Sequence, residues 1–167
     1  MILNPGDVVL VHGTGWLSRA IRFLEPGPSW TSHCAIAVDS VNIVEALSRG
    51  VVERRLDTAY PTSRVRVYRP INIPQSTLVH IARRAEKFVG RPYGFGKLAL
   101  HALDGMLGGM YVFRRLAFLD RYPICSFVVA SAYADEGFHF GVPEREATPD
   151  DIHDFVVRER EKYERVM

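Results

Sequence analysis

Hydrophobic and polar residues change their spacing along the chain, and these changes divide it into short strands and helices. A short strand is predicted at 8–12, where four apolar residues precede His12. Further strands are predicted at about 32–38, 42–48, 50–56 and 63–69, with turn residues between them. In the last of these strands arginine alternates with valine, which predicts one wet face and one buried face. Strands that follow one another so closely predict a largely antiparallel sheet.

Apolar residues at helical spacing mark five other segments. Helices are predicted at 16–24, from Pro74 to Val89, at 97–119, from Cys125 to about Asp135, and after the capping sequence Thr148-Pro149. Strands clustered between helical segments predict an α+β fold. With 167 residues, the chain suits one domain, expected over 1–157. The charged residues 158–167 are expected to form a tail, either a solvated helix end or a frayed terminus.

Composition narrows the classes of partner. A net charge of +2, with scattered arginines, predicts no nucleic-acid partner. No apolar run reaches the roughly 18 residues of a membrane span. Two cysteines without a recognisable export signal predict free thiols in a cytoplasmic protein. Ligand-type residues do not occur at metal-site spacing, and Gly13-Thr14-Gly15 lacks the lysine of a phosphate loop, so no metal or cofactor is predicted.

Cys125 is the first candidate for chemistry. Pro123 precedes it and a helix-forming stretch follows, which places its thiol at a helix N-terminus, where the macrodipole favours thiolate. His33 heads an apolar strand about ninety residues upstream, and a cysteine with a distant histidine is the minimum set for nucleophilic catalysis. Taken alone, each residue more often has a structural role, as a small core cysteine or a satisfied core or surface histidine.

Glu45 is the candidate partner of the histidine. It lies twelve residues after His33, an even separation that puts both on one face of a hairpin when the loop has an odd number of residues. A carboxylate there would orient the imidazole; alternatively, Glu45 faces water at a strand edge. Cys34 should point to the opposite face, into the core. His12 is a second candidate near the site, or else a strand-end histidine that meets solvent or a loop carbonyl.

Five short motifs occur together in a distinctive order: Gly6 to Leu10, Ser32 to Val38, Val44-Glu45-Ala46 with Gly50-Val51-Val52, Gly90 to Phe95, and Cys125-Ser126. Over roughly 5–152 this pattern resembles the circularly permuted papain-like NlpC/P60 enzymes, the permuted amidases of the YiiX/YaeF type. The resemblance implies a permuted topology in which the histidine strand precedes the cysteine helix. It also implies that Cys125 is the nucleophile, His33 the general base and then acid, and Glu45 the residue that orients it.

The same resemblance extends to substrate and activity. It places Tyr93 near the active-site cleft and implies hydrolysis of an amide or related acyl bond in a small peptide, an acylated amine or a lipid. Phe127 stands where relatives often carry an acidic residue, which affects the substrate-facing surface. Two alternatives remain open. One is a lipid acyltransferase or phospholipase, with 97–119 as a lid or lipid-facing surface in place of core helices; the other is a non-catalytic binding module.

Overall fold

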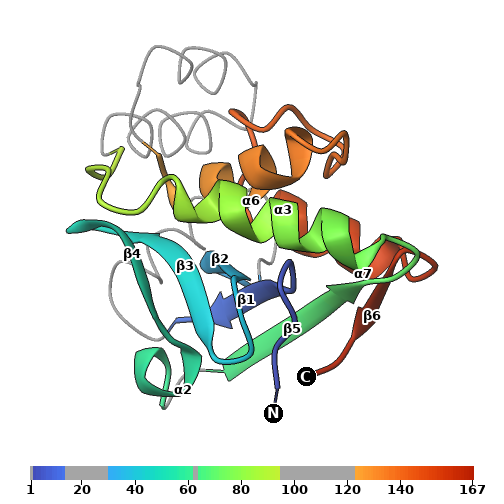
Figure 1. Ribbon diagram of the computed structural model, residues 1–167, viewed down its shortest axis with the longest axis horizontal. Helices are drawn as coiled ribbons and strands as arrows, with labels where there is room; N and C mark the ends of the chain where they lie inside the picture. Colours follow the sequence, from blue (N-terminus) through green and yellow to red (C-terminus); the bar gives the residue numbers. More distant parts are fainter. Residues whose placement is uncertain (1, 14–29, 62–63, 95–122) are drawn as a thin grey trace.

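A single antiparallel sheet organises the molecule. The computed structural model describes residues 2–13, 30–61, 64–94 and 123–167. Six strands pair in the order β4-β3-β2-β1-β5-β6, and every pairing is antiparallel (Figure 1). Their bounds are β1 Val8–His12, β2 His33–Ala37, β3 Asn42–Leu47, β4 Gly50–Arg55, β5 Arg64–Pro70 and β6 Tyr163–Arg165. The predicted α+β class and antiparallel sheet are confirmed.

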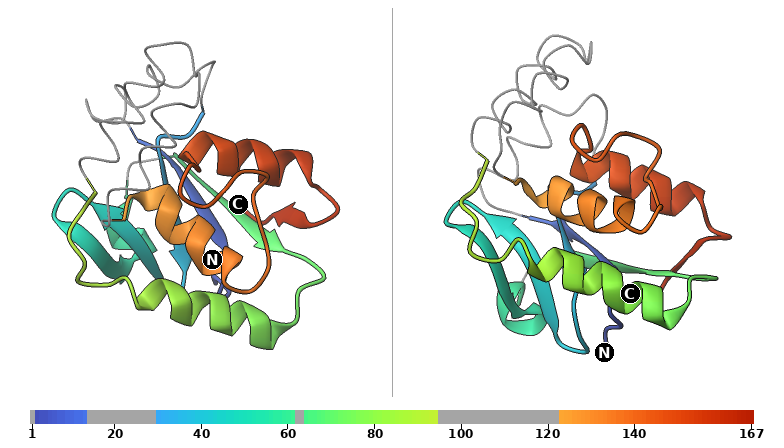
Figure 2. Two further views of the ribbon diagram at one scale, coloured as in Figure 1. Left: turned by 90° about the horizontal axis from the view of Figure 1, so that it is seen from above. Right: turned by 45° about the horizontal axis from the view of Figure 1, so that its top comes forward.

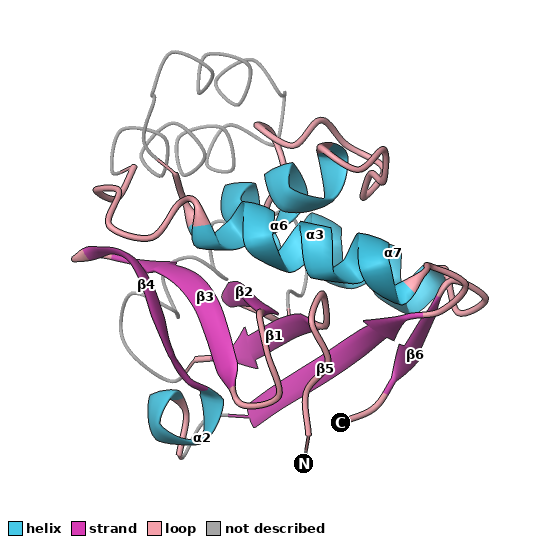
Figure 3. Ribbon diagram, viewed as in Figure 1, coloured by secondary structure: helices cyan, strands magenta, loops and turns pink. Residues whose placement is uncertain are grey.

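Three helices lie side by side over one face of this sheet (Figures 1 and 2). They are α3 Gln75–Glu86, α6 Cys125–Ala134 and α7 Pro149–Arg158, and the short α2 Leu56–Ala59 follows β4 at the opposite side (Figure 3). The three long helices begin and end close to the predicted positions. The helices predicted at 16–24 and 97–119 lie outside the described residues.

Strand alternation divides the buried side chains into two clusters. Leu10, Cys34 and Val44 face the helices and pack with α6, whereas Val11, Ala35 and Ile43 belong to a second cluster on the other face. Helix α6 is central: it contacts β2, β3, α3 and α7, and most of its residues are buried. A helix that is apolar nearly all round belongs in such a position, because it has no face left for water.

The start of α7 follows its sequence signal closely. The Thr148 side chain accepts a hydrogen bond from the Asp151 backbone at 3.1 Å, and the Asp151 carboxylate accepts one from the Thr148 backbone at 2.9 Å. This reciprocal capping box, with Pro149 at the first helical position, satisfies amide groups that the first turn leaves without helical acceptors. Helix α7 is thereby fixed at the point where it meets the sheet.

The last ten residues do not form a solvated or frayed tail. Tyr163–Arg165 form β6, which pairs with β5 and extends the sheet. The Tyr163 ring is buried in the helix-side cluster against Phe140 and Phe155. One inward aromatic residue on a short edge strand is enough to anchor this segment, and its charged neighbours remain exposed.

Candidate active site

The site lies where β2 and β3 separate. Their ladder includes Ala37 with Ile43 and Ile36 with Val44, and no further pair toward His33. The backbone N–H of Val38 donates to Asn42 at 3.0 Å. The N–H groups of Ile36 and Cys34 point the same way, because hydrogen-bonding directions alternate along a strand. Cys34 has no pairing residue on β3, so the Cys34 N–H is available to another acceptor.

That acceptor is the Cys125 sulfur, at the first residue of α6. Its sulfur faces the Cys34 backbone N–H, the Cys34 thiol and the His33 side chain, and all three lower the pKa of the Cys125 thiol. Both cysteines are free and buried, with Cys125 6% exposed and Cys34 fully covered. The predicted position of Cys34 in the core is confirmed. Its thiol nevertheless touches the candidate nucleophile, which the sequence did not indicate.

Glu45 holds His33 from the other side. The imidazole Nε2 lies 2.6 Å from the Glu45 Oε2, which leaves Nδ1 as the ring nitrogen for Cys125. The loop between the paired residues 37 and 43 has an odd number of residues, so the two side chains share a face as the hairpin predicted. Glu45 is fully buried, and the alternative of a water-facing strand-edge residue is wrong.

Two further donors bind the Glu45 carboxylate. The Arg54 Nε donates to one oxygen and the Tyr60 hydroxyl to the other. The guanidinium of Arg54 also lies 5.4 Å from the centre of the Tyr60 ring. A buried carboxylate without partners would be costly, and here three side chains satisfy it. This arrangement fixes both the charge and the position of the group that orients His33.

The electrostatics favour an ion pair between cysteine and histidine. The Cys34 hydrogen bond, opposed by burial and assisted by the charge of His33, holds the pKa of Cys125 well below that of an ordinary thiol. Burial opposes protonation of His33, but Cys125 and Glu45 outweigh it and raise the imidazole pKa to about 10. Burial also opposes ionisation of Glu45, yet bonds from His33, Tyr60 and Arg54 lower its pKa to about 2. At neutral pH the group is therefore thiolate, imidazolium and carboxylate.

Tyr93 lies beside this group on a loop fixed at two points. Val51 donates to the Arg91 carbonyl at 2.9 Å, and Gly94 donates to the Pro123 carbonyl, also at 2.9 Å, just before α6. Gly50 permits the first tether, because it has φ +118° and a Cβ there would lie 2.8 Å from the Arg91 oxygen. Burial, with the charge of Cys125 second, raises the pKa of Tyr93, so its hydroxyl stays protonated near the thiolate.

His12 turns toward a loop carbonyl. Its Nδ1 lies 2.6 Å from the Trp30 carbonyl oxygen, which fixes a proton on that nitrogen. The His12 ring also lies against the Trp30 indole, with centroids 5.6 Å apart. This is the loop-carbonyl alternative raised by the sequence. Among the described residues, no hydrogen bond or ring contact joins His12 to Cys125, His33 or Glu45, and its role toward substrate stays a prediction.

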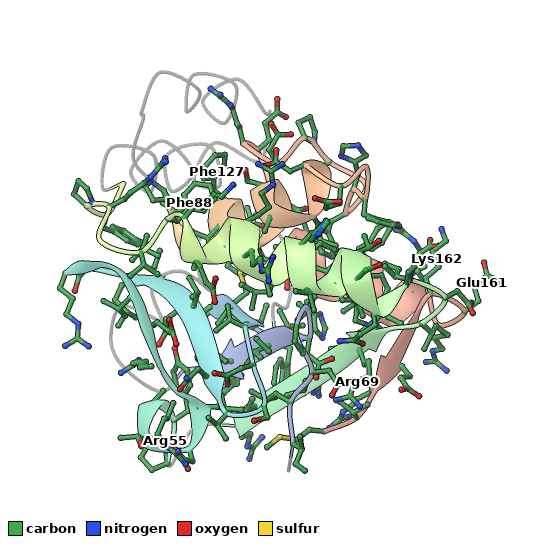
Figure 4. The ribbon with its side chains drawn as sticks, in the orientation of Figure 1. Arg55, Arg69, Phe88, Phe127, Glu161 and Lys162 are labelled. Carbon is green, nitrogen blue, oxygen red and sulfur yellow. The ribbon has the colours of Figure 1, made fainter. Side chains whose placement is uncertain are left out.

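Phe127 lies two residues after the nucleophile, in the first turn of α6. Its ring meets Phe88, at the end of α3, edge to face with centroids 5.8 Å apart (Figure 4). The Arg91 guanidinium covers the same Phe88 ring at 4.8 Å. An acidic side chain could not make this aromatic contact. Phe127 therefore has an apolar partner at this position.

Ser126 is the one buried side-chain polar atom without a hydrogen-bond partner among the described residues. A buried hydroxyl left in this state costs about 1–3 kcal/mol. Ser126 follows Cys125 directly in α6 and is fully covered.

Three residues of the site escaped sequence reasoning: Cys34, Arg54 and Tyr60. For Arg54 a signal existed. The tight turn at Ser48-Arg49 sets the β3–β4 register, which places Arg54 opposite Ile43, diagonal to Glu45 on the same face. Tyr60 follows the short helix α2, which has no strong sequence signature. The contact of Cys34 with Cys125 depends on where the pairing of β2 with β3 ends, which the sequence does not indicate.

One group of side chains has the composition of a cation site. Within the described residues, ligand atoms of Asp150, His153 and Asp154 lie within 4.8 Å of one another at the start of α7. Both nitrogens of His153 are engaged, however: Nδ1 lies 3.2 Å from Asp154, and Nε2 lies 3.2 Å from the Arg66 guanidinium. A guanidinium beside the imidazole opposes a metal ion at that nitrogen.

Comparison with known proteins identifies the fold. No family model matches the sequence, and no curated protein matches it. Among solved structures, the chain is similar to the metalloprotein YiiX from Escherichia coli O157:H7, with a TM-score of 0.58 and 16% identity, over all of this chain and 89% of that one. The fold is YiiX-like. At this identity the likeness extends to the fold alone.

Within the described residues, no helix combines the length and apolar character needed to cross a membrane.

Proposed function

We propose that this protein is a cysteine hydrolase that cleaves an amide or related acyl bond. One observation carries the proposal: His33, whose Nε2 lies 2.6 Å from the Glu45 Oε2, also faces Cys125 at the N-terminus of α6, and its charge lowers the pKa of that thiol. A nucleophile, a base within reach and a third group that orients the base make up the arrangement used for covalent catalysis.

In the first step the Cys125 thiolate attacks the carbonyl carbon of the substrate. A carbon–sulfur bond forms, and the carbonyl electron pair moves to oxygen to give a tetrahedral intermediate. When this collapses, the carbon–leaving-group bond breaks and His33 donates its proton to the departing amine or alkoxide. His33, then neutral, takes a proton from water, which attacks the thioester and releases the acid. Expulsion of the thiolate restores the starting pair.

The backbone supplies charge stabilisation for the intermediate. Helix α6 begins at Cys125 without a side-chain cap, and the Val128 N–H donates to the carbonyl of the N-cap residue Ile124 at 3.1 Å. The Cys125 N–H therefore has no acceptor within the helix and can donate to the oxyanion, assisted by the macrodipole. Ser126 is a candidate second donor, because its buried hydroxyl lacks a partner among the described residues.

The alternatives have less support. A lipid acyltransferase or phospholipase would use the same thiol and histidine, but the segment expected to contact lipid, 97–119, lies outside the described residues. A non-catalytic binding module would have no need of a thiolate held by three donors beside an oriented imidazole. Small peptides and acylated amines remain the proposed substrates.

The test is the pH dependence of iodoacetamide alkylation at each cysteine, read by mass spectrometry. Cys125 should react well below pH 7, because the thiolate is already present. In His33→Ala the midpoint should rise by about two pH units or more toward that of a free thiol. Cys34 supplies the internal control, since burial raises the pKa of its thiol first and the Cys125 charge raises it further.

Product formation must also depend on Cys125. A panel of acylated amines and small peptides should yield products with wild type and none with Cys125→Ala. Retained turnover in Cys125→Ala would contradict the proposal. So would alkylation of Cys125 with an ordinary midpoint in both wild type and His33→Ala.

A further inference from the structure

A basic cavity lies away from the cysteine, between α7 and the strands β5 and β6. It has a volume of about 490 Å³. Three arginines line it, Arg66 from β5, Arg160 after α7 and Arg165 from β6, and Glu164 is the single acidic residue in its wall. A concave surface with this excess of one charge concentrates the field and attracts ions of the opposite sign.

The acidic residue is partly compensated from outside the cavity. Glu164 is directly opposite Arg69 in the pairing of β5 with β6. The charge of Glu164 contributes to the raised pKa of Arg69, after the larger effect of the Asp7 hydrogen bonds. Of the three cavity arginines, Arg165 donates from its Nε to the Met167 main-chain oxygen at 2.8 Å, whereas Arg66 and Arg160 have no carboxylate partner among the described residues. The wall therefore keeps a net positive charge.

Arg66 is held in position before any ligand arrives. Its guanidinium lies 3.7 Å from the centre of the Trp30 ring, and Trp30 in turn stacks on His153 with centroids 5.8 Å apart. The Arg66 Nη1 also lies 3.2 Å from the His153 Nε2, so this nitrogen accepts the bond. Because a guanidinium has five N–H donors and this contact uses one, most of the fork remains available.

We propose that this cavity binds the phosphate group of a small phosphorylated molecule. Guanidinium groups recognise phosphate through paired N–H donors, and a phosphate dianion matches several of them better than a carboxylate does. The volume exceeds what one phosphate needs, which leaves room for an organic substituent. The residues differ from those of the cysteine site, so this inference does not depend on the proposed hydrolase.

The experiment titrates the full chain with inorganic phosphate, glycerol 3-phosphate and acetate at constant ionic strength, followed by calorimetry and by NMR shifts of backbone amides. Both phosphates should bind, and acetate should bind more weakly, with shifts grouped on β5, β6 and α7. Tighter binding of glycerol 3-phosphate would identify an organic phosphate as the ligand. Equal binding of the two would identify phosphate itself.

Two substitutions and a matched control locate the binding. Arg160→Gln, at an exposed position, should weaken phosphate binding by about tenfold without loss of fold, and Arg66→Gln should weaken it at least as much. Arg158→Gln removes the same charge from α7 at a residue that does not line the cavity, and should change little. Equal effects of Arg158→Gln and Arg160→Gln, or the absence of any titratable binding, would overturn the proposal.

Discussion

Two carboxylates are fully buried in the described part of this chain. The partners of one indicate a structural role, and those of the other a role in the proposed chemistry. Asp7, just before β1, accepts from the Arg69 Nε at 3.0 Å and the Arg69 Nη2 at 2.8 Å, and from the Asn4 backbone at 2.9 Å. Glu45, on β3, is bound by Arg54, Tyr60 and His33. Both are satisfied, but only Glu45 has a partner that loses and regains a proton in the proposed reaction.

The difference shows what a buried charge needs in each role. Asp7 ties the N-terminus to β5 through an arginine fork that is always charged, so its environment is the same at every working pH. Glu45 must remain ionised whether or not its histidine carries a proton. Arg54 and Tyr60 provide for that, because they keep two donors on the carboxylate throughout a proton-transfer cycle. Two donors besides the histidine are what we expect of a carboxylate whose role is to position His33.

The sharpest test of this comparison replaces each carboxylate by its amide. In Glu45→Gln the new NH₂ cannot accept, so at least one of three donors faces another donor. We expect the free energy of unfolding to fall by about 3 kcal/mol, as for loss of one partner in a buried ion pair. We also expect the midpoint of Cys125 alkylation to rise by about one pH unit, because the imidazolium loses its counter-charge.

Asp7→Asn is the matched control. It should also lower the free energy of unfolding, by about 1–3 kcal/mol, since the amide disrupts the bonds from Arg69 and Asn4. The alkylation midpoint of Cys125 should stay at the wild-type value. Chemical denaturation and the alkylation profile measure the two quantities separately. An equal shift of the midpoint in both variants would abolish the distinction drawn between the two carboxylates.

Acid unfolding tests the charge on Glu45 directly. Its pKa is lowered from 4.5 to about 2 in the folded protein, so its contribution is complete above pH 4.5 and is lost as the pH falls toward 2. The stability difference between wild type and Glu45→Gln should therefore be constant from pH 7 to 5 and shrink by up to about 3 kcal/mol below that. Denaturant titrations at successive pH values measure it. A difference that does not change with pH would show that Glu45 is not ionised.

The sequence predicted the elements that have strong local signals. The strands are bounded by turn residues, α7 has a capping box, and His33 and Glu45 share a face because hairpin parity requires it. It missed β6, in which only Tyr163 faces inward and the two charged neighbours give the composition of a tail. Three residues on a sheet edge have too little periodicity to be recognised without the strand that they pair with.

The contact between Cys34 and Cys125 could not be predicted for a different reason. Alternation correctly directs the Cys34 side chain to the core, but it says nothing of where the pairing of β2 and β3 stops. That point is set by the packing of α6 against both strands, which is a tertiary property. The site therefore combines local signals, for His33 and Glu45, with a non-local one at Cys34.

Cys34 acts on the Cys125 thiol directly, whereas Glu45 acts on it through His33. Its hydrogen bond is the largest factor that lowers the pKa of Cys125. Cys34→Val removes this donor at similar volume and should raise the alkylation midpoint of Cys125 by about one pH unit. Cys34→Ser keeps a hydroxyl donor at the same place and should restore most of the effect. If valine and serine give the same midpoint, Cys34 only fills space.

The smallest expected effect concerns the redundancy of the support around Glu45. Tyr60→Phe removes one of the three donors and keeps the ring that faces Arg54, so the free energy of unfolding should fall by about 1 kcal/mol. Arg54 and His33 still bind the carboxylate, and the alkylation midpoint should therefore move by only a few tenths of a pH unit. If instead Tyr60→Phe shifts the midpoint as far as Glu45→Gln does, the hydroxyl is essential to the orientation of Glu45. The three donors would then not be interchangeable, and the support of Glu45 would not be redundant.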